Sequence, residues 1–169
     1  MKTNFPTYTF LLALFTAFTI SAQSQSQDSV GFVEAKIHAK AQFKNGAVHL
    51  RWAPNAHYTF AVVKKAGYVI ERYNPNSKTF ERLATLKPYT IAEFKSNLDT
   101  TNQYVTTAAQ ALWGKPNLPV SANANPLEAA KIKAEEQNNR FVFAMLAAEY
   151  NREAATGLAL YFKDETALP

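Results

Sequence analysis

The chain has 169 residues, no cysteine and a formal net charge of +5 at neutral pH. This length predicts one domain whose core is large enough to fold without disulfide bonds. The absence of cysteine excludes thiol catalysis and cysteine metal sites. The basic residues are interspersed rather than clustered, so we expect a solvated surface and no nucleic-acid binding.

The first 22 residues have the features of an export signal. Lys2 supplies a positive end, and the apolar run from Phe10 to Ile20 has the length of a signal-peptide core but is too short to cross a bilayer. We predict a signal peptide at 1–22, a polar spacer at 23–29 and a domain at 30–169 with no membrane span after cleavage. The protein is then exported, to the periplasm, the outer surface or the medium. A buried N-terminal helix is the alternative interpretation of the apolar run.

Two strands are predicted at the start of the domain, at about 30–43 and at 46–54, because apolar and polar residues alternate there. In the second stretch Val48, Leu50 and Trp52 share one side, and Pro54 ends the strand because it cannot donate to a ladder. Trp52 is therefore the predicted centre of the core.

The next segments predict a connection and a hairpin. Residues 54–67 are expected to form a longer connection with a helical turn that points Phe60 and Val63 inward. Strands at 67–73 and 79–84 then flank the turn Asn74-Pro75-Asn76-Ser77. The apolar residues that we expect this second strand to contribute are Phe80 and Leu83.

From residue 90 the hydrophobic period changes to that of helices. Thr90 and Glu93 form a predicted capping box before a short helix. A second start is predicted at Thr100 and Gln103, with a left-handed stop at Gly114. The inward stripe of this second helix is predicted to be Tyr104, Val105, Ala108 and Leu112.

A long third helix is predicted to begin at Asn125 and Pro126 and to reach Ala154 or Ala155. Charge pairs in its first half, such as Glu136 with Arg140, predict a solvent-facing side. Its second half is apolar, with Phe141, Val142, Met145, Leu146 and Ala148 on one broad face. A last strand is predicted at 158–162.

The strand residues Leu50–Pro54 and Gly67–Tyr73 resemble the tryptophan-bearing second strand and the third strand of a fibronectin type III domain. The helical block through 111–114 and the helix running into 157–160 are similar to secreted fibronectin type III-like proteins of Gram-negative bacteria whose domain is interrupted by helices. The resemblance implies a mainly β, α+β fold: an antiparallel β-sandwich with two or three helices inserted at about 90–156.

The same resemblance implies two more strands after 158–162, so the sandwich is expected to be incomplete at the C-terminus. Two explanations remain open. The chain is an N-terminal part of a longer protein, or its sheet has an open edge that another segment must cover.

No enzyme signature is found in the sequence. His38, His49 and His57 lack the spacing of zinc ligands on a helix, and HExxH, GxSxG and phosphate-binding glycine loops are absent. A glycosidase needs two facing carboxylates. Glu149 with Arg152 and Glu71 with Arg72 instead predict solvated ion pairs. We therefore expect no catalytic residue, cofactor or metal.

Aromatic residues provide the candidate binding surface, because their rings can stack on sugars or anchor a protein partner. The candidates are Tyr58, Tyr73, Tyr89, Tyr104, Trp113 and Tyr161. Packing in the core and at its rim is the alternative role, above all for Trp113.

The sequence thus predicts a non-catalytic interaction or scaffold module at the bacterial cell surface or in the periplasm, with a protein or glycan partner. The alternative is a carbohydrate-binding or accessory module of a secreted polysaccharide-degrading system. A glycan module requires a planar row of exposed aromatic rings, whereas a protein-binding module requires an apolar patch or an open sheet edge.

Overall fold

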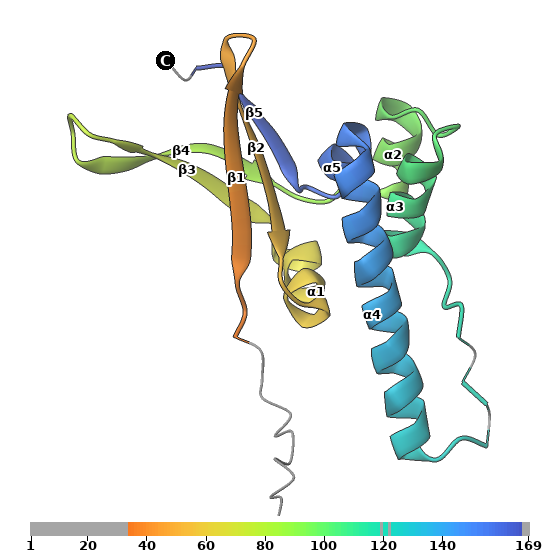
Figure 1. The fold of residues 1–169 in the computed structure, drawn as a ribbon. Coiled ribbons are helices and arrows are strands. Elements are labelled where there is room, and N and C mark those ends of the chain that lie inside the picture. Colours follow the sequence, from red (N-terminus) through yellow and green to blue (C-terminus); the bar gives the residue numbers. More distant parts are fainter. Residues whose placement is uncertain (1–33, 119, 122, 167–169) are drawn as a thin grey trace, which may run out of the picture. The chain divides into compact units, whose positions relative to one another are not determined.

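The structure, a computed structural model, describes residues 34–118, 120–121 and 123–166 (Figure 1). The predicted signal peptide and spacer lie outside these residues. The described part is a mixed α+β fold with two antiparallel sheets, and about 45% of it is helical and 27% strand. The α+β class is therefore confirmed, whereas the expectation of a mainly β protein is wrong because helix exceeds strand.

The first sheet has the strand order β1-β2-β5, and all its strands are antiparallel. Its members are β1 (Ile37–Lys44), β2 (Ala47–Pro54) and β5 (Tyr161–Asp164). Asn45 and Gly46 join β1 to β2 with φ values of 52° and 74°, the conformation that a two-residue hairpin turn favours. Trp52 is buried, as predicted, and its ring meets Tyr68 edge-on at a centroid distance of 5.4 Å.

The second sheet is the predicted hairpin, formed by β3 (Tyr68–Asn74) and β4 (Thr79–Leu86). The register shifts between Ile70 and Glu71. Phe80 is 70% exposed and lies against Tyr73 on the outer face of the hairpin, so it contributes nothing to the core. The alternation identified the strand correctly, but the tip of this hairpin extends beyond the packed region, as Figure 1 shows.

The predicted connection at 54–67 contains a complete helix, α1 (His57–Ala66). Phe60 is buried and Val63 is partly buried against the core, as expected. The length of the helix was missed because its N-cap residue, Ala56, makes no side-chain cap bond that the sequence could reveal.

The capping box before α2 (Ile91–Asn97) is present as predicted. Thr90 donates its backbone N–H to the Glu93 carboxylate at 2.7 Å, and Glu93 returns its N–H to the threonine hydroxyl at 3.3 Å. The start of α3 (Gln103–Trp113) was misplaced, since Asn102 rather than Thr100 caps it by accepting from the N–H of Tyr104 at 2.9 Å.

Gly114 ends α3 with φ −60°, so the predicted left-handed stop is wrong. Close packing rather than backbone conformation favours glycine at this position, because a Cβ there would lie 2.6 Å from the carbonyl oxygen of Gln110. The core stripe of α3 is otherwise as predicted, with Val105, Ala108 and Leu112 buried and Tyr104 partly buried.

Asn125 caps α4 (Pro126–Tyr150), accepting from the N–H of Glu128 at 2.9 Å. The prediction that this helix continues to 154–155 is wrong, because Asn151 leaves the helical region and starts α5 (Arg152–Gly157). The Asn151 side chain accepts from the N–H of Ala154 at 2.8 Å, so the residue that ends one helix caps the next.

Asn151→Ala is expected to lower the free energy of unfolding by about 1 kcal/mol, the usual cost of losing an N-cap. Asn138→Ala, an exposed asparagine inside α4, is the control and should be neutral or slightly stabilising. Urea unfolding of the two variants measures the difference. An equal effect of both substitutions would contradict the capping role.

The core packs the helices around small residues. Alanines at 108, 144, 147 and 154 are buried and let α3, α4 and α5 approach one another closely. Leu158 and Leu160 are also buried, but they precede β5 instead of forming the predicted strand at 158–162, since Ala159 has φ 56° and bends the chain. Among the described residues, no helix combines the length and hydrophobicity that crossing a bilayer requires.

Candidate binding surfaces

The first candidate surface is a row of apolar side chains on β1, namely Ile37, Ala39, Ala41 and Phe43, called here the β1 row. Antiparallel pairing sets Ala39 opposite Trp52, so the β1 row shares the inward face of the first sheet. All of β1 is nevertheless exposed, and Ile37 and Phe43 are each 50% exposed. The apolar face of this sheet thus extends beyond the part that the other described residues cover.

The β3–β4 hairpin covers the other part of that face. Tyr68 of β3 packs on Trp52 of β2, and Arg72 of β3 donates to the Asp164 carboxylate of β5 at 2.9 Å. Burial acts to raise the pKa of Asp164, but hydrogen bonds from Thr166 and the nearby Arg72 outweigh it, so this pKa lies below its usual value. β3 is therefore fixed over β2 and β5, while β1 stays exposed among the described residues.

β3 also has an open edge. Among the described residues it pairs only with β4, and β1 pairs only with β2. An unpaired edge presents alternating N–H and C=O groups that can bind another extended segment. Burial raises the pKa of the Tyr68 hydroxyl at the start of β3, and this hydroxyl has no hydrogen-bond partner among the described residues.

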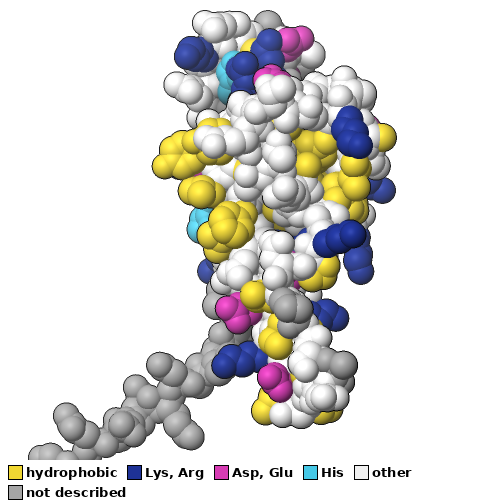
Figure 2. Space-filling model, turned by 90° about the vertical axis from the view of Figure 1, so that its right-hand side faces the viewer, with side chains coloured by type: hydrophobic (Ala, Val, Ile, Leu, Met, Phe, Trp, Pro, Cys, Tyr) yellow, Lys and Arg dark blue, Asp and Glu magenta, His cyan; other side chains and the backbone are white. Residues whose placement is uncertain are grey.

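The first sheet also forms a groove with α4, of about 1000 Å³, whose lining includes Ala39 and Ala41 of the β1 row as well as Arg51 of the opposite face. Its strand wall includes a charged contact with α4, since Arg51 donates to the carbonyl of Ala148 and lies 3.5 Å from the Glu149 carboxylate. Its helix wall includes the half-exposed Val142 and Leu146, so the apolar face predicted for this part of α4 is only partly buried. The helical side of the molecule shows hydrophobic side chains interspersed with lysines and arginines (Figure 2).

The six predicted aromatic residues lie on α1, β3, the segment before α2, α3 and β5. Four of them contact another ring: Tyr58 contacts His57, Tyr73 contacts Phe80, Tyr89 contacts Phe94 and Tyr104 contacts Tyr150. The other two form hydrogen bonds. The Trp113 indole N–H donates to the Tyr89 carbonyl at 2.8 Å, and the Tyr161 hydroxyl lies 2.6 Å from a ring nitrogen of His49. The structure thus brings Tyr89 and Trp113 together and gives the other four separate neighbours.

The carboxylates have other partners than those predicted. The Glu149 carboxylate faces Arg51 rather than Arg152. The Glu71 carboxylate lies 3.9 Å from the Arg82 guanidinium and does not pair with that of Arg72. No three histidine, aspartate or glutamate side chains of the described segments come together as a metal site.

Sequence reasoning missed two features. The β1 row was recognised as part of an alternating strand, but the exposure of this apolar side was not predicted. A cluster of Lys64, Lys65 and Arg140 also went unnoticed, because α1 and α4 bring together residues that are distant in sequence. No family model, curated protein or solved structure matches the chain.

Proposed function

We propose that the protein is a non-catalytic, exported interaction module that binds a protein partner at the cell surface or in the periplasm by accepting a β-strand. The observation that carries the proposal is the exposed β1 row lying on the same sheet face as the buried Trp52. Monomeric proteins rarely leave the inward face of a sheet uncovered, and such faces mark interaction sites.

We also propose that the two sheets form a fibronectin type III-like sandwich in which the described residues provide all but the last two strands. The strand orders β1-β2-β5 and β3-β4 support it. In a sandwich of this kind the two later strands extend the sheet of β3 and face the other sheet. An incoming strand at the β3 edge then also covers the β1 row.

Both sources of affinity in strand addition are available at this surface. The open edge of β3 provides backbone donors and acceptors, and Ile37 and Phe43 provide apolar area. Lys40 and Lys44 project from the other face of β1, where charge discourages indiscriminate pairing of this edge strand. The surface therefore favours a partner whose strand alternates apolar and polar residues.

The test is selection of displayed random peptides of about 10 residues, long enough for one strand, on the purified full chain. The selected peptides should alternate apolar and polar residues, and hydrogen exchange should show protection of the β3 amides when they bind. Phe43→Asp should weaken binding at least about tenfold, because it places a carboxylate in the apolar contact. Phe80→Asp is the matched control, since Phe80 lies on the outer face of the hairpin, and should change affinity less than about twofold.

Protection confined to the groove between β1–β2 and α4, with Phe43→Asp binding as well as the unchanged protein, would refute strand acceptance. Sedimentation of the free chain at several concentrations adds a second outcome. Self-association that Phe43→Asp abolishes and Phe80→Asp preserves would identify a second copy of the chain as the strand donor.

A further inference from the structure

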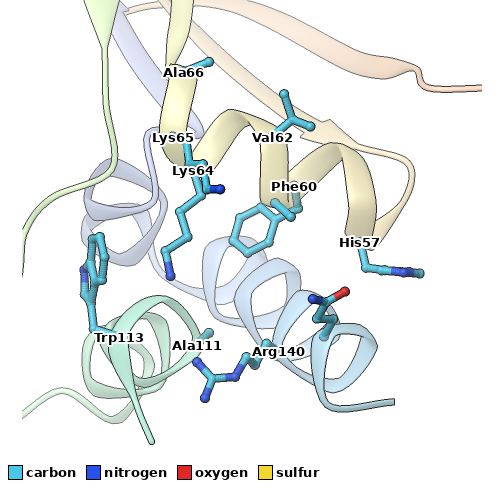
Figure 3. A pocket seen from close by; sticks show the side chains of 11 residues that line it. His57, Phe60, Val62, Lys64, Lys65, Ala66, Ala111, Trp113 and Arg140 are labelled. Carbon is cyan, nitrogen blue, oxygen red and sulfur yellow. The ribbon is translucent and has the colours of Figure 1, made fainter. Parts of the chain in front are cut away.

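A hollow of about 1140 Å³ opens between α1, the C-terminal end of α3 and α4 (Figure 3). It is separate from the β1 row and from the edge of β3. Part of its lining is apolar, since Phe60 and Ala111 are buried core residues whose side chains reach it. Trp113, the last residue of α3, forms an aromatic wall at one side (Figure 3). The hollow can therefore accommodate a flat apolar group.

The charged side chains that line the hollow are all positive. Lys64 and Lys65 come from the last turn of α1, and Arg140 comes from α4. The Lys64 ammonium and the Arg140 guanidinium point toward the space between the helices in Figure 3. None of the described residues that line the hollow is an aspartate or glutamate. The charge of the lining is thus complementary to an anion.

Backbone carbonyls at the end of α3 hold two of these cations in place. Lys64 donates to the carbonyl of Leu112, and Arg140 donates to the carbonyl of Gly114 at 2.7 Å. The Lys64 nitrogen also lies 4.3 Å from the centroid of the Trp113 ring. These carbonyls carry the partial negative charge of a helix C-terminus, which attracts cations but does not neutralise them.

Arg140 is paired with the Glu136 carboxylate at 2.8 Å, whereas the two lysines retain unused binding capacity. An ammonium group has three donors, and the carbonyl of Leu112 accepts only one hydrogen bond from Lys64. Lys65 has no ion-pair partner among the described residues. Burial and the positive charges of Arg140 and Lys65 lower the pKa of Lys64. An anion placed between the two lysines would relieve this repulsion.

We infer that the hollow binds a small organic anion, with its carboxylate or phosphate between Lys64 and Lys65 and its flat apolar body against Phe60 and Trp113. The lysines favour the anionic head, as does the absence of a carboxylate among the described lining residues, and the buried ring of Phe60 favours the apolar body. This site is independent of strand acceptance, because it uses α1, α3 and α4 rather than the sheets.

The test is titration of the full chain with 2-naphthoate and with phenyl phosphate, followed by the NMR signals of the two tryptophan indole N–H groups. Either anion should shift the Trp113 signal and leave that of the buried Trp52 in place. Lys64→Met keeps the aliphatic stem and should weaken binding at least about tenfold. Lys95→Met, an exposed lysine of α2 outside the hollow, is the matched control and should leave affinity unchanged.

Three further measurements test whether binding requires the second lysine, the anionic head and the apolar body of the ligand. Lys65→Met removes an exposed ammonium group that forms no hydrogen bond with another described side chain, and should weaken binding about threefold without affecting the fold. Acetate has the carboxylate without the flat apolar body, and 2-naphthalenemethanol has the flat apolar body without the charge. Each should bind at least about tenfold more weakly than naphthoate. The inference fails if neither anion shifts the Trp113 signal at millimolar concentration, if the neutral alcohol binds as well as naphthoate, or if both lysine variants keep full affinity.

Discussion

Phe94→Ala is expected to lower the free energy of unfolding by about 3–5 kcal/mol, the range for truncating a buried aromatic residue. Phe94 is 2% exposed and packs edge-on against Tyr89 at a centroid distance of 6.0 Å. Its ring fills the space above Gly157, where a Cβ would lie 2.6 Å from the ring atoms. Removing the ring therefore leaves a cavity between α2 and α5 that rigid helices cannot close.

Phe80→Ala is the control for this prediction, because Phe80 is the same residue type and is exposed at the hairpin tip. It should change the free energy of unfolding by no more than about 0.5 kcal/mol. Equilibrium unfolding in urea, followed by circular dichroism, measures both variants. A loss of less than about 1 kcal/mol for Phe94→Ala would show that α2 is not part of the cooperative core.

Local signals in the sequence predicted most of the secondary structure. The alternation around Trp52 set the register of β2, and the capping residues Thr90 and Asn125 located two helix starts. These predictions succeeded because each depends on residues within one turn or one strand. Helix α1 was underestimated because no side chain caps its start.

The break between α4 and α5 shows what local signals cannot decide. Alanines at 147, 148, 154 and 155 favour one continuous helix, but the same four alanines are buried by tertiary packing in two helices. Asn151 makes the break inexpensive, since its side chain caps α5. Propensity alone gives no reason to stop at this asparagine.

The candidate surfaces were harder to predict than the fold. Alternation identifies the inward side of β1, but it cannot reveal whether another element covers that side, and here Phe43 is left half exposed. The cationic hollow depends on Lys64 and Arg140 meeting at the end of α3, which no sequence spacing encodes. Of the aromatic candidates, only Trp113 lines the hollow.

Glu136 was predicted correctly as the ion-pair partner of Arg140 but wrongly as solvent-facing. The residue is 8% exposed, and its carboxylate accepts from the Arg140 guanidinium at 2.8 Å. It also accepts from the backbone N–H groups of Asn117 and Leu118, at 3.2 and 3.3 Å. One carboxylate therefore fixes the segment after α3 to α4 and holds Arg140 beside the hollow.

Glu136→Gln is expected to lower the free energy of unfolding by about 2–3 kcal/mol near neutral pH, because it leaves a largely buried guanidinium without its counter-charge. Glu135→Gln replaces the exposed neighbour and should cost no more than about 0.5 kcal/mol. Urea unfolding of both variants beside the unchanged chain provides the measurement.

The difference in the free energy of unfolding between the unchanged chain and Glu136→Gln should also depend on pH. The hydrogen bond from Arg140 is the main cause that keeps the pKa of Glu136 below its usual value of 4.5, against the effect of burial. A carboxyl group whose pKa is lower in the folded state stabilises the protein fully above its unfolded pKa, and this stability is lost as the pH falls through the folded value. This difference in stability should therefore be largest near pH 7 and shrink progressively below about pH 4.5. If the difference in stability stays constant as the solution is acidified, the packing of the Glu136 side chain rather than its charge stabilises the fold.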